Sequence, residues 1–243
     1  MKYQLKYRRF GPHSILIEWP SIIDRNVLND VLNYKNSIID LYIKEKVEII
    51  NTYNSILVDY DNTIDKINDE IFKLKQIYSS LNSEDKQQKT LWEIPTCYDD
   101  EFGIDLEDIS IAKKMSKSEI IELHSNTIYD VYFIGFLPGF LYLGGLDERL
   151  YFNRKSIPNL NVKRGSVAIG GQQTGIYPQN SPGGWHILGN SPVNFFNSED
   201  PKPCFVKAGD MIKFVPISKH DYMDILKLSR ENLYQPKSTL VYD

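Results

Sequence analysis

The chain has 243 residues, of which 42% are hydrophobic and 25% are charged, and its formal net charge is −4. This length suits one large domain or two small ones and is sufficient to bury a core. The acidic balance argues against a general binder of nucleic acid or of anionic membranes, because such proteins present a basic surface.

The first ninety residues mix strands with helices. Alternating polar and apolar residues predict four strands, over residues 3–7, 15–18, 48–51 and 55–59. A first helix, with Ser21 as its predicted N-cap, has its apolar face at Leu28, Val31 and Leu32. A second helix shows the clearest periodicity, at Ile64, Ile67, Ile71, Leu74 and Tyr78. Two helices on one face of a small sheet make an α+β domain, which we place at residues 1–85.

A polar segment, SSLNSEDKQQK, occupies residues 79–89 and has no periodic apolar pattern. Such a segment is typical of a linker, and a solvated loop inside one domain has the same composition. We interpret it as the boundary between the domain at 1–85 and a second domain at 90–243.

Beyond the linker, two short helices precede a region of strands. Asp105 is positioned to cap a helix that runs through Met115, and Ser116 with Glu119 has the pattern of a capping box. Alternation predicts strands over residues 128–133, 167–169 and 211–215, and a last helix begins after Ser218. Many short strands between glycine-containing turns predict a closed or nearly closed β-barrel.

Residues 135–189 contain eleven of the fourteen glycines, interleaved with aromatic residues. Among the aromatic residues are Phe136, Phe140, Tyr142, Tyr177 and Trp185. Glycine permits close approach to the main chain, and a flexible linker would be poor in aromatic residues. We therefore expect the function to lie on this segment, as a surface of tight turns lined by rings. The same aromatic loop would serve equally well as the cover of the domain's own core.

Several common sites are absent from the sequence. It contains no phosphate-binding P-loop, no G-x-G-x-x-G turn, no G-x-S-x-G nucleophile elbow and no H-E-x-x-H zinc helix. The four histidines, His13, His124, His186 and His220, are scattered and lack cysteine pairs, so no metal site is expected. A nucleotide would have to bind without a standard cradle.

The expected compartment follows from what the chain lacks. Cys97 and Cys204 have no C-x-x-C spacing and are too few for a disulfide scaffold, so two reduced thiols are expected. No apolar run approaches the ~20 residues that a membrane-spanning helix needs, and no apolar secretory core follows Met1. We expect a cytoplasmic protein without membrane or nucleic-acid partners.

Charged side chains near the glycine-rich turns are the first candidates for a site. His124 lies between an apolar helix end and a strand, as either a hydrogen-bonded structural residue or an acid or base. Arg154, Lys163 and Arg164 offer positive charge to a phosphate or carboxylate, arginine through a bidentate fork. A solvated charged loop explains the same three residues.

Short polar groups on the turns complete the candidate substrate or nucleotide site. They are Gln172, Thr174, Tyr177, Ser181, Gly183 and Gly184. Pro178 and Pro182 fix the shape of this loop, which lowers the entropy cost of binding. Phe136, Phe140 and Trp185 are the candidate partner-binding residues, because aromatic side chains dominate many protein interfaces.

Longer motifs resemble a known family. They are GFLPGFLYLGGL at 135–146, RGSVAIGGQQTGIYP at 164–178 and SPGGWHILGNSP at 181–192, preceded by ILVDYD at 56–61 and FGIDLEDIS at 102–110. In this order they resemble the allophanate hydrolase subunit 1 family. That family contains the B subunit of bacterial 5-oxoprolinase, Kip-type inhibitors of sporulation histidine kinases, and half of the carboxyltransferase domain of urea carboxylase. The resemblance spans nearly the whole chain.

The resemblance implies an N-terminal α+β domain followed by a C-terminal cyclophilin-like β-barrel. It also implies a companion subunit 2 chain and a 5-oxoprolinase A chain, which together convert 5-oxoproline to glutamate at the expense of ATP. Phosphorylating the lactam oxygen creates a leaving group, and the developing negative charge then needs fixed donors. Arg154, Gln172, Thr174 and the backbone N–H groups near Gly183 are the donors that the resemblance suggests, with His124 as acid, base or orienting residue.

The chain departs from the family pattern at three positions. The family has two Pro-Arg pairs and a Val-Pro-Ala-Gly turn in this region. Here Asn153-Arg154 keeps only the first arginine, Pro158-Asn159 lacks the second, and Val162-Lys163-Arg164-Gly165 replaces the turn. If the missing arginine held substrate, Lys163 or Arg164 must take its place. The alternatives are a Kip-type inhibitor that binds a sensor histidine kinase, and a scaffold chain whose partner carries every catalytic residue.

Overall fold

The computed structural model describes residues 3–42, 47–81 and 88–242. By its internal contacts the chain divides into two compact units, an N-terminal unit at Met1–Gln87 and a C-terminal unit at Gln88–Asp243. Most of the predicted linker, residues 82–87, lies outside the described residues. Its first residues, Ser79 and Ser80, end a helix, and its last, Gln88 and Lys89, begin a strand.

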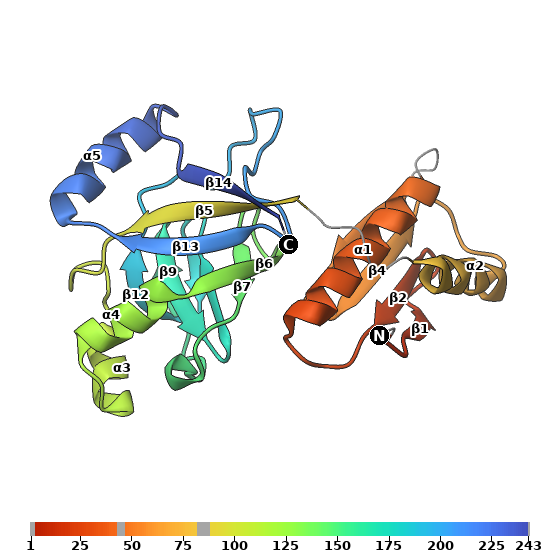
Figure 1. Ribbon diagram of the computed structural model, residues 1–243, viewed down its shortest axis with the longest axis horizontal. Helices are drawn as coiled ribbons and strands as arrows, with labels where there is room; N and C mark the ends of the chain where they lie inside the picture. Colours follow the sequence, from red (N-terminus) through yellow and green to blue (C-terminus); the bar gives the residue numbers. More distant parts are fainter. Residues whose placement is uncertain (1–2, 43–46, 82–87, 243) are drawn as a thin grey trace. The chain divides into compact units, whose positions relative to one another are not determined.

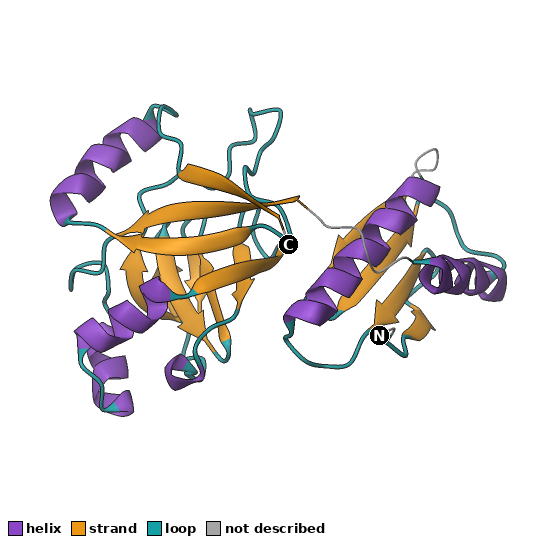
Figure 2. Cartoon of the chain, viewed as in Figure 1, coloured by secondary structure: helices purple, strands orange, loops and turns teal. Residues whose placement is uncertain are grey.

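The N-terminal unit is an antiparallel sheet with helices (Figures 1 and 2). Its strands, in the order β1-β2-β4-β3, are β1 (Lys6–Arg9), β2 (Ser14–Glu18), β4 (Ser55–Tyr60) and β3 (Val47–Asn51). The helices are α1 (Arg25–Leu41) and α2 (Ile67–Ser80). Alternate residues of β2 and β4 form the buried face of the sheet, because successive side chains in a strand point to opposite faces.

Helix α1 begins three residues later than predicted. Asp24, not Ser21, is its N-cap, and the Asp24 carboxylate accepts from the backbone N–H groups of Asn26 and Val27. The predicted apolar face is correct, since Leu28, Val31 and Leu32 are all buried.

The C-terminal unit contains an eight-stranded sheet in the order β12-β9-β10-β7-β6-β13-β5-β14. The strands are β5 (Gln88–Thr96), β6 (Ile128–Ile134), β7 (Leu141–Gly144), β9 (Ser166–Gly170), β10 (Gln173–Ile176), β12 (His186–Asn190), β13 (Met211–Pro216) and β14 (Lys237–Tyr242). A separate pair consists of β8 (Asn159–Val162) and β11 (Ser181–Gly183). All neighbours are antiparallel except β13 and β5, which are parallel.

Three helices and one 3₁₀ turn complete this unit's described regular structure, apart from its strands, with α5 near β14 in Figure 1. They are α3 (Leu106–Lys113), α4 (Lys117–Asn126), the turn η1 (Glu148–Leu150) and α5 (Lys219–Arg230). The Ser116–Glu119 capping box of α4 is present as predicted, and Ser218 caps α5.

The α+β class is confirmed, whereas a closed barrel is not shown. Strands β12 and β14 remain the two ends of the strand order among the described residues. One isolated bridge links the residue after β5 to the edge strand β12: Cys97 and Asn190 exchange two backbone hydrogen bonds of 2.9 Å. A single bridge does not make a continuous ladder around the sheet.

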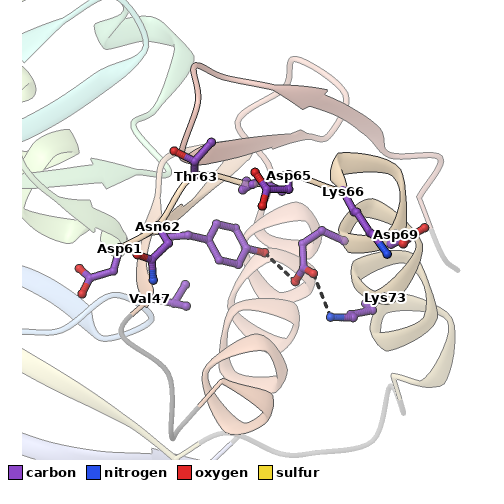
Figure 3. A pocket seen from close by; sticks show the side chains of 11 residues that line it. Val47, Asp61, Asn62, Thr63, Asp65, Lys66, Asp69 and Lys73 are labelled. Carbon is purple, nitrogen blue, oxygen red and sulfur yellow. Dashed lines mark hydrogen bonds and ion pairs between the residues drawn. The ribbon is translucent and has the colours of Figure 1, made fainter.

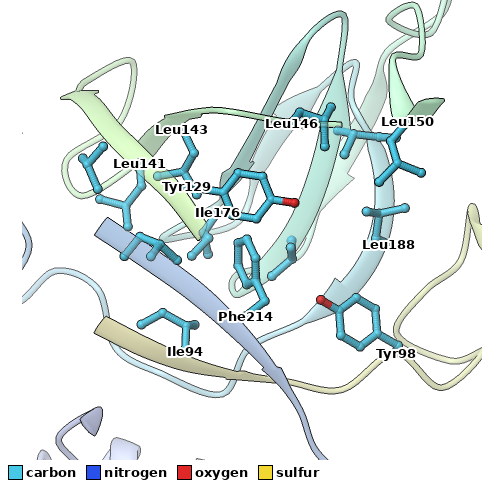
Figure 4. Close-up of a cluster of buried hydrophobic side chains, with 14 of the residues drawn as sticks. Ile94, Tyr98, Tyr129, Leu141, Leu143, Leu146, Leu150, Ile176, Leu188 and Phe214 are labelled. Atoms are coloured by element: carbon cyan, nitrogen blue, oxygen red, sulfur yellow. The ribbon is translucent and has the colours of Figure 1, made fainter. Parts of the chain in front are cut away.

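One large hydrophobic cluster forms the core of the C-terminal unit (Figure 4). Four different strands contribute to it through Tyr129, Leu141, Ile176 and Phe214, none of which is more than 2% exposed. The family segment at 135–192 supplies β7, β9, β10 and β12 of the eight-stranded sheet, whose packed core holds the connecting loops in place.

Among the described residues, no helix combines the length and the apolar character that crossing a membrane requires.

Candidate functional site

Arg154 lies on a segment whose backbone is anchored on both sides. Before it, Nε2 of His186 donates to the carbonyl oxygen of Asn153 at 3.0 Å. After it, the amide of Lys155 donates to the carbonyl oxygen of Gly184 at 2.7 Å. Burial lowers the pKa of His186, which favours the neutral ring that donates through Nε2. The backbone is therefore fixed while the Arg154 side chain remains exposed.

Arg154 lies over Trp185, one of a group of rings that we call the aromatic cluster: Phe140, Tyr142, Tyr177 and Trp185. Its guanidinium carbon lies 5.6 Å from the centre of the Trp185 ring, within the range of a cation–π contact. Phe140 meets Tyr177 and Trp185 edge to face, with ring centres 4.9 and 5.7 Å apart. Burial raises the pKa of Tyr177 to about 12, so its phenol is neutral beneath the arginine.

Two glycines make room for Trp185. A Cβ added at Gly170 would lie 2.5 Å from the Trp185 ring, and one at Gly175 would lie 3.0 Å from it and 2.5 Å from the carbonyl oxygen of Leu141. The two distances of 2.5 Å are too short for a real side chain, and 3.0 Å is unusually tight, so the ring or the strand would have to move. The absence of a side chain at these two glycines therefore lets the indole pack closely against β9 and β10.

The three predicted partner-binding residues differ in exposure. Phe140 is 2% exposed and Trp185 is 4% exposed, so both belong to the interior of the C-terminal unit. Phe136 is 66% exposed and has a positive φ of 67°, a conformation that bulky residues rarely adopt. The predicted partner-binding role of Phe140 and Trp185 stays a prediction that this burial does not support, whereas Phe136 is the one of the three that presents an exposed ring.

Asp105 forms a buried ion pair below the Arg154 segment, which the sequence did not reveal. One carboxylate oxygen lies 2.6 Å from Nζ of Lys155, and the other accepts from the amide of Ile187 at 2.7 Å. Asp105 was predicted to cap α3, and although it occupies the N-cap position its side chain makes no capping bond. Its carboxylate instead ties the Arg154 segment to strand β12.

His124 is sealed inside the C-terminal unit. Tyr98 Oη lies 2.8 Å from Nδ1, and Thr174 Oγ1 lies 3.0 Å from Nε2 and donates to the carbonyl oxygen of Ala168. Since Thr174 has a single proton to donate, Nε2 must carry the proton and Nδ1 must accept from Tyr98. Burial lowers the pKa of His124 to about 3.

The structure therefore favours the structural alternative for His124. Its side chain and that of Thr174 have 0% exposure, so neither contacts a substrate in this conformation. The predicted roles of His124 as acid or base and of Thr174 as substrate donor stay predictions that this burial does not support. His124 fastens α4 to β10, and its ring stacks on Phe214 at 4.5 Å between centres.

The remaining predicted turn residues lie around β11 and the β9–β10 turn. Gln172 is exposed on that turn. Ser181 is 8% exposed, and its Oγ has no hydrogen-bond partner among the described residues. Gly183 packs on Tyr177, since a Cβ there would lie 2.3 Å from the phenol oxygen. Gly184 has more room, because the nearest atom to an added Cβ would be the carbonyl oxygen of Lys155 at 3.7 Å.

Lys163 and Arg164 lie away from the aromatic cluster, at the end of β8. They line a cleft of about 640 Å³ whose other walls are residues 101–104 and the first turns of α5. We call it the β8–α5 cleft. The structure thus separates the predicted cations into two places, Arg154 over the aromatic cluster and the Lys163–Arg164 pair in this cleft.

The N-terminal unit has a pocket of about 650 Å³ beside α2 (Figure 3). Glu70 occupies its wall, accepting from Tyr60 Oη at 3.2 Å and pairing with Lys73 at 3.0 Å. Burial opposes ionisation of Glu70, but the hydrogen bonds from Tyr42 and Lys73 outweigh it and lower its pKa. No residue predicted as a site lies here, and the described residues contain no cluster of three or more potential metal ligands.

Comparison with known proteins places this geometry in a family. Residues 5–206 match the family model described as carboxyltransferase domain, subdomain C and D. The chain therefore belongs to this family, and the resemblance to allophanate hydrolase subunit 1 proteins is confirmed.

Two relatives are each named as the B subunit of 5-oxoprolinase. The protein of Bacillus subtilis (strain 168) is 46% identical over 130 residues, 54% of this chain and 54% of that protein. The protein of Haemophilus influenzae (strain ATCC 51907 / DSM 11121 / KW20 / Rd) is 40% identical over 169 residues, 70% of this chain and 78% of that protein. The match thus spans about half the length of the first relative and more of the second.

A solved structure shows the same fold. The urea carboxylase of Kluyveromyces lactis aligns with 99% of this chain and 24% of its own, with a TM-score of 0.82 and 16% identity. At this identity the likeness concerns the fold only.

Proposed function

We propose that this chain is the B subunit of an ATP-dependent 5-oxoprolinase, a hydrolase that opens 5-oxoproline to glutamate. One observation carries the proposal: 40% identity to a relative of that name over 70% of this chain. The proposal includes partner chains, namely a subunit 2 homologue and a 5-oxoprolinase A chain, and a cytoplasmic location. It also includes a cyclophilin-like barrel topology for residues 90–243.

The chemistry assigns Arg154 the main role in this chain. Opening a lactam places negative charge on its carbonyl oxygen, and attaching a phosphoryl group from ATP adds more. A fixed cation stabilises such charge best when it needs no reorganisation. Arg154 has this character, because its flanking backbone groups are anchored and its head lies on Trp185. Gln172 and the backbone at Gly184 are further exposed or half-exposed donors of the same region.

Reconstitution tests the proposal. The full chain is mixed with its subunit 2 homologue and A chain, and glutamate is measured from 5-oxoproline with and without ATP. We expect glutamate only when all chains and ATP are present. Correctly folded chains that form glutamate in no combination would overturn the proposal. No observation favours the Kip-type alternative, in which the chain alone inhibits a histidine kinase.

A further inference from the structure

The β8–α5 cleft carries an excess of positive charge. Lys163 and Arg164 line it, and neither makes an ion pair within the part of the chain that the structure describes. A third cation, Lys219, also lines the cleft but pairs with Glu101 at 2.8 Å. Two cations therefore face the cleft without a carboxylate to neutralise them, although the chain as a whole is acidic.

Arg164 is held in place through its backbone on both sides. Its amide donates to Oδ1 of Asn180 at 2.8 Å, and its carbonyl oxygen accepts from Nδ2 of Asn190 at 2.9 Å. Gly165 follows with a φ of 81°, and a Cβ there would lie 2.2 Å from the carbonyl oxygen of Ser191. The backbone of the turn that carries Lys163 and Arg164 is thus fixed, so binding does not have to order this loop.

Asn190 links this turn to the opposite wall. Its Oδ1 accepts from Tyr222 Oη of α5 at 2.9 Å, and Asn190 itself is only 6% exposed. The Arg164 charge acts on the Tyr222 phenol and partly offsets the effect of burial, which raises the pKa of Tyr222. Because Arg164 and Tyr222 both bond to the Asn190 side chain, they meet where the two walls of the cleft join.

The rest of the lining combines polar side chains with an apolar group. Phe102, Ile187, Met223 and Leu226 contribute to it, and the Phe102 ring lies 4.4 Å from that of Tyr222. Small-molecule sites are usually concave, mostly apolar, and furnished with a few fixed polar groups. A volume of about 640 Å³ also falls within the usual range of such sites.

We propose that the β8–α5 cleft binds a small ligand through a carboxylate or phosphate held by Arg164 and Lys163, with the ligand's remaining part against the apolar wall. Arginine grips either anion through two parallel hydrogen bonds, and lysine adds a point charge. Within the proposed function, on which this identification rests, the cleft is a second anion site, separate from the place where Arg154 faces the reacting carbonyl, and its ligand carries a carboxylate, as 5-oxoproline does, or phosphates, as ATP does.

Binding to the full isolated chain tests the proposal without requiring catalysis. ATP, inorganic phosphate and 5-oxoproline are titrated separately by calorimetry, into the unaltered chain and into R164Q, K163Q and K227Q. Lys227 is an exposed cation of α5 outside the cleft, so K227Q removes the same charge as a matched control. We expect R164Q to weaken binding about tenfold or more and K163Q severalfold, with K227Q unchanged.

Each result decides the proposal. Binding of ATP or phosphate that R164Q weakens identifies a phosphate site, and the same result with 5-oxoproline identifies a carboxylate site. Absence of binding by all three probes at concentrations up to about 10 mM, or equal losses in R164Q and K227Q, overturns it. If R164Q melts at a lower temperature than the unaltered chain, K163Q decides alone. If the complex forms glutamate while the isolated chain binds no anion, the cleft proposal is wrong and the proposed function stands. If the chain binds an anion through Arg164 while no complex forms glutamate, the cleft stands as an anion site and the proposed function is wrong.

Discussion

The guanidinium carbon of Arg154 lies 5.6 Å from the centre of the Trp185 ring, so an exposed cation rests on a buried aromatic residue. The indole provides a flat, fixed support, and the anchored backbone on either side of Arg154 limits its freedom. In this pair, Arg154 is an accessible residue of the predicted site, and Trp185 is the buried residue that supports it. It also separates their roles, with Trp185 in packing and Arg154 in charge.

Arg154→Ala should abolish most catalysis with little effect on stability. An exposed cation–π contact contributes about 0.5–1 kcal/mol, whereas losing a fixed donor to a developing anion costs about 10²–10³ in kcat. Arg154→Lys should restore little, because an ammonium cannot reproduce the stacked, bidentate group. Turnover of the reconstituted complex and urea unfolding measure the two effects. Arg149→Ala, at an exposed arginine paired with Asp147, is the matched control and should leave turnover unchanged. Equal turnover in both variants would contradict the role of Arg154.

Phe136→Gly should stabilise the chain and weaken its complex. The φ of 67° is unfavourable for phenylalanine and free for glycine, so relief of strain should add about 1 kcal/mol to the free energy of unfolding. If the exposed ring is a central contact of a partner chain, its loss should cost about 2 kcal/mol or more of binding. Urea unfolding and affinity for the subunit 2 homologue measure these changes. Unchanged affinity would remove Phe136 from the interface.

Gly170→Ala should destabilise the C-terminal unit through Trp185. The added Cβ would lie 2.5 Å from the indole, and overpacking of this kind costs about 1–3 kcal/mol. Trp185→Ala should cost about 3–5 kcal/mol by leaving a cavity. The double variant should cost less than the sum, because the alanine then occupies emptied space. Gly135→Ala is the control, since its nearest contact would be an ordinary 3.6 Å. Additive losses would show that Gly170 and Trp185 are independent.

His124 should make stability depend on pH in a defined direction. The pKa of His124 is lowered from its ordinary value of 6.5 to about 3 in the folded chain. Between these two pH values the unfolded chain therefore binds a proton at His124 that the folded chain does not. The contribution is complete above pH 6.5 and is lost as the pH falls toward 3, by on the order of 1 kcal/mol per pH unit. His124→Gln should unfold more readily at pH 7 and show a shallower loss between pH 6 and 4. Parallel curves for the two proteins would contradict this account. Turnover between pH 6 and 8 should keep its profile in the variant, because His124 does not titrate there.

Local patterns predicted most of the N-terminal unit. Its four strands and two helices follow from periodicity, although β1 lies at Lys6–Arg9 rather than at residues 3–7 and is largely exposed. The error at the start of α1 has a physical cause. Ser21 and Asp24 are both good caps, and the choice between them depends on how the chain leaves β2, which no local pattern encodes.

The C-terminal unit was harder because its key contacts join distant residues. Of the strands described in this unit, only β6, β9 and β13 were predicted. Among the others, β5 pairs with partners more than a hundred residues away, and β14 is largely exposed and so lacks a clear alternation. The direction of Trp185 was also open from the sequence. Only the register of β9 and β10 brings Gly170 and Gly175 opposite the indole and turns it inward. Asp105 was assigned to the wrong local partner for the same reason, since its true contacts lie 50 and 82 residues further along.

The position of β5 within the sheet has a consequence for biosynthesis. Leu91 pairs with Met211 of β13 on one side and Thr239 of β14 on the other, so β5 cannot pair until these two later strands have been synthesised. At about 5–20 residues per second, a ribosome needs on the order of ten seconds to deliver them. During that interval both edges of β5 are unpaired, with Leu91, Trp92 and Ile94 uncovered. We expect newly made β5 to be the stretch that aggregates most readily and that a chaperone protects first.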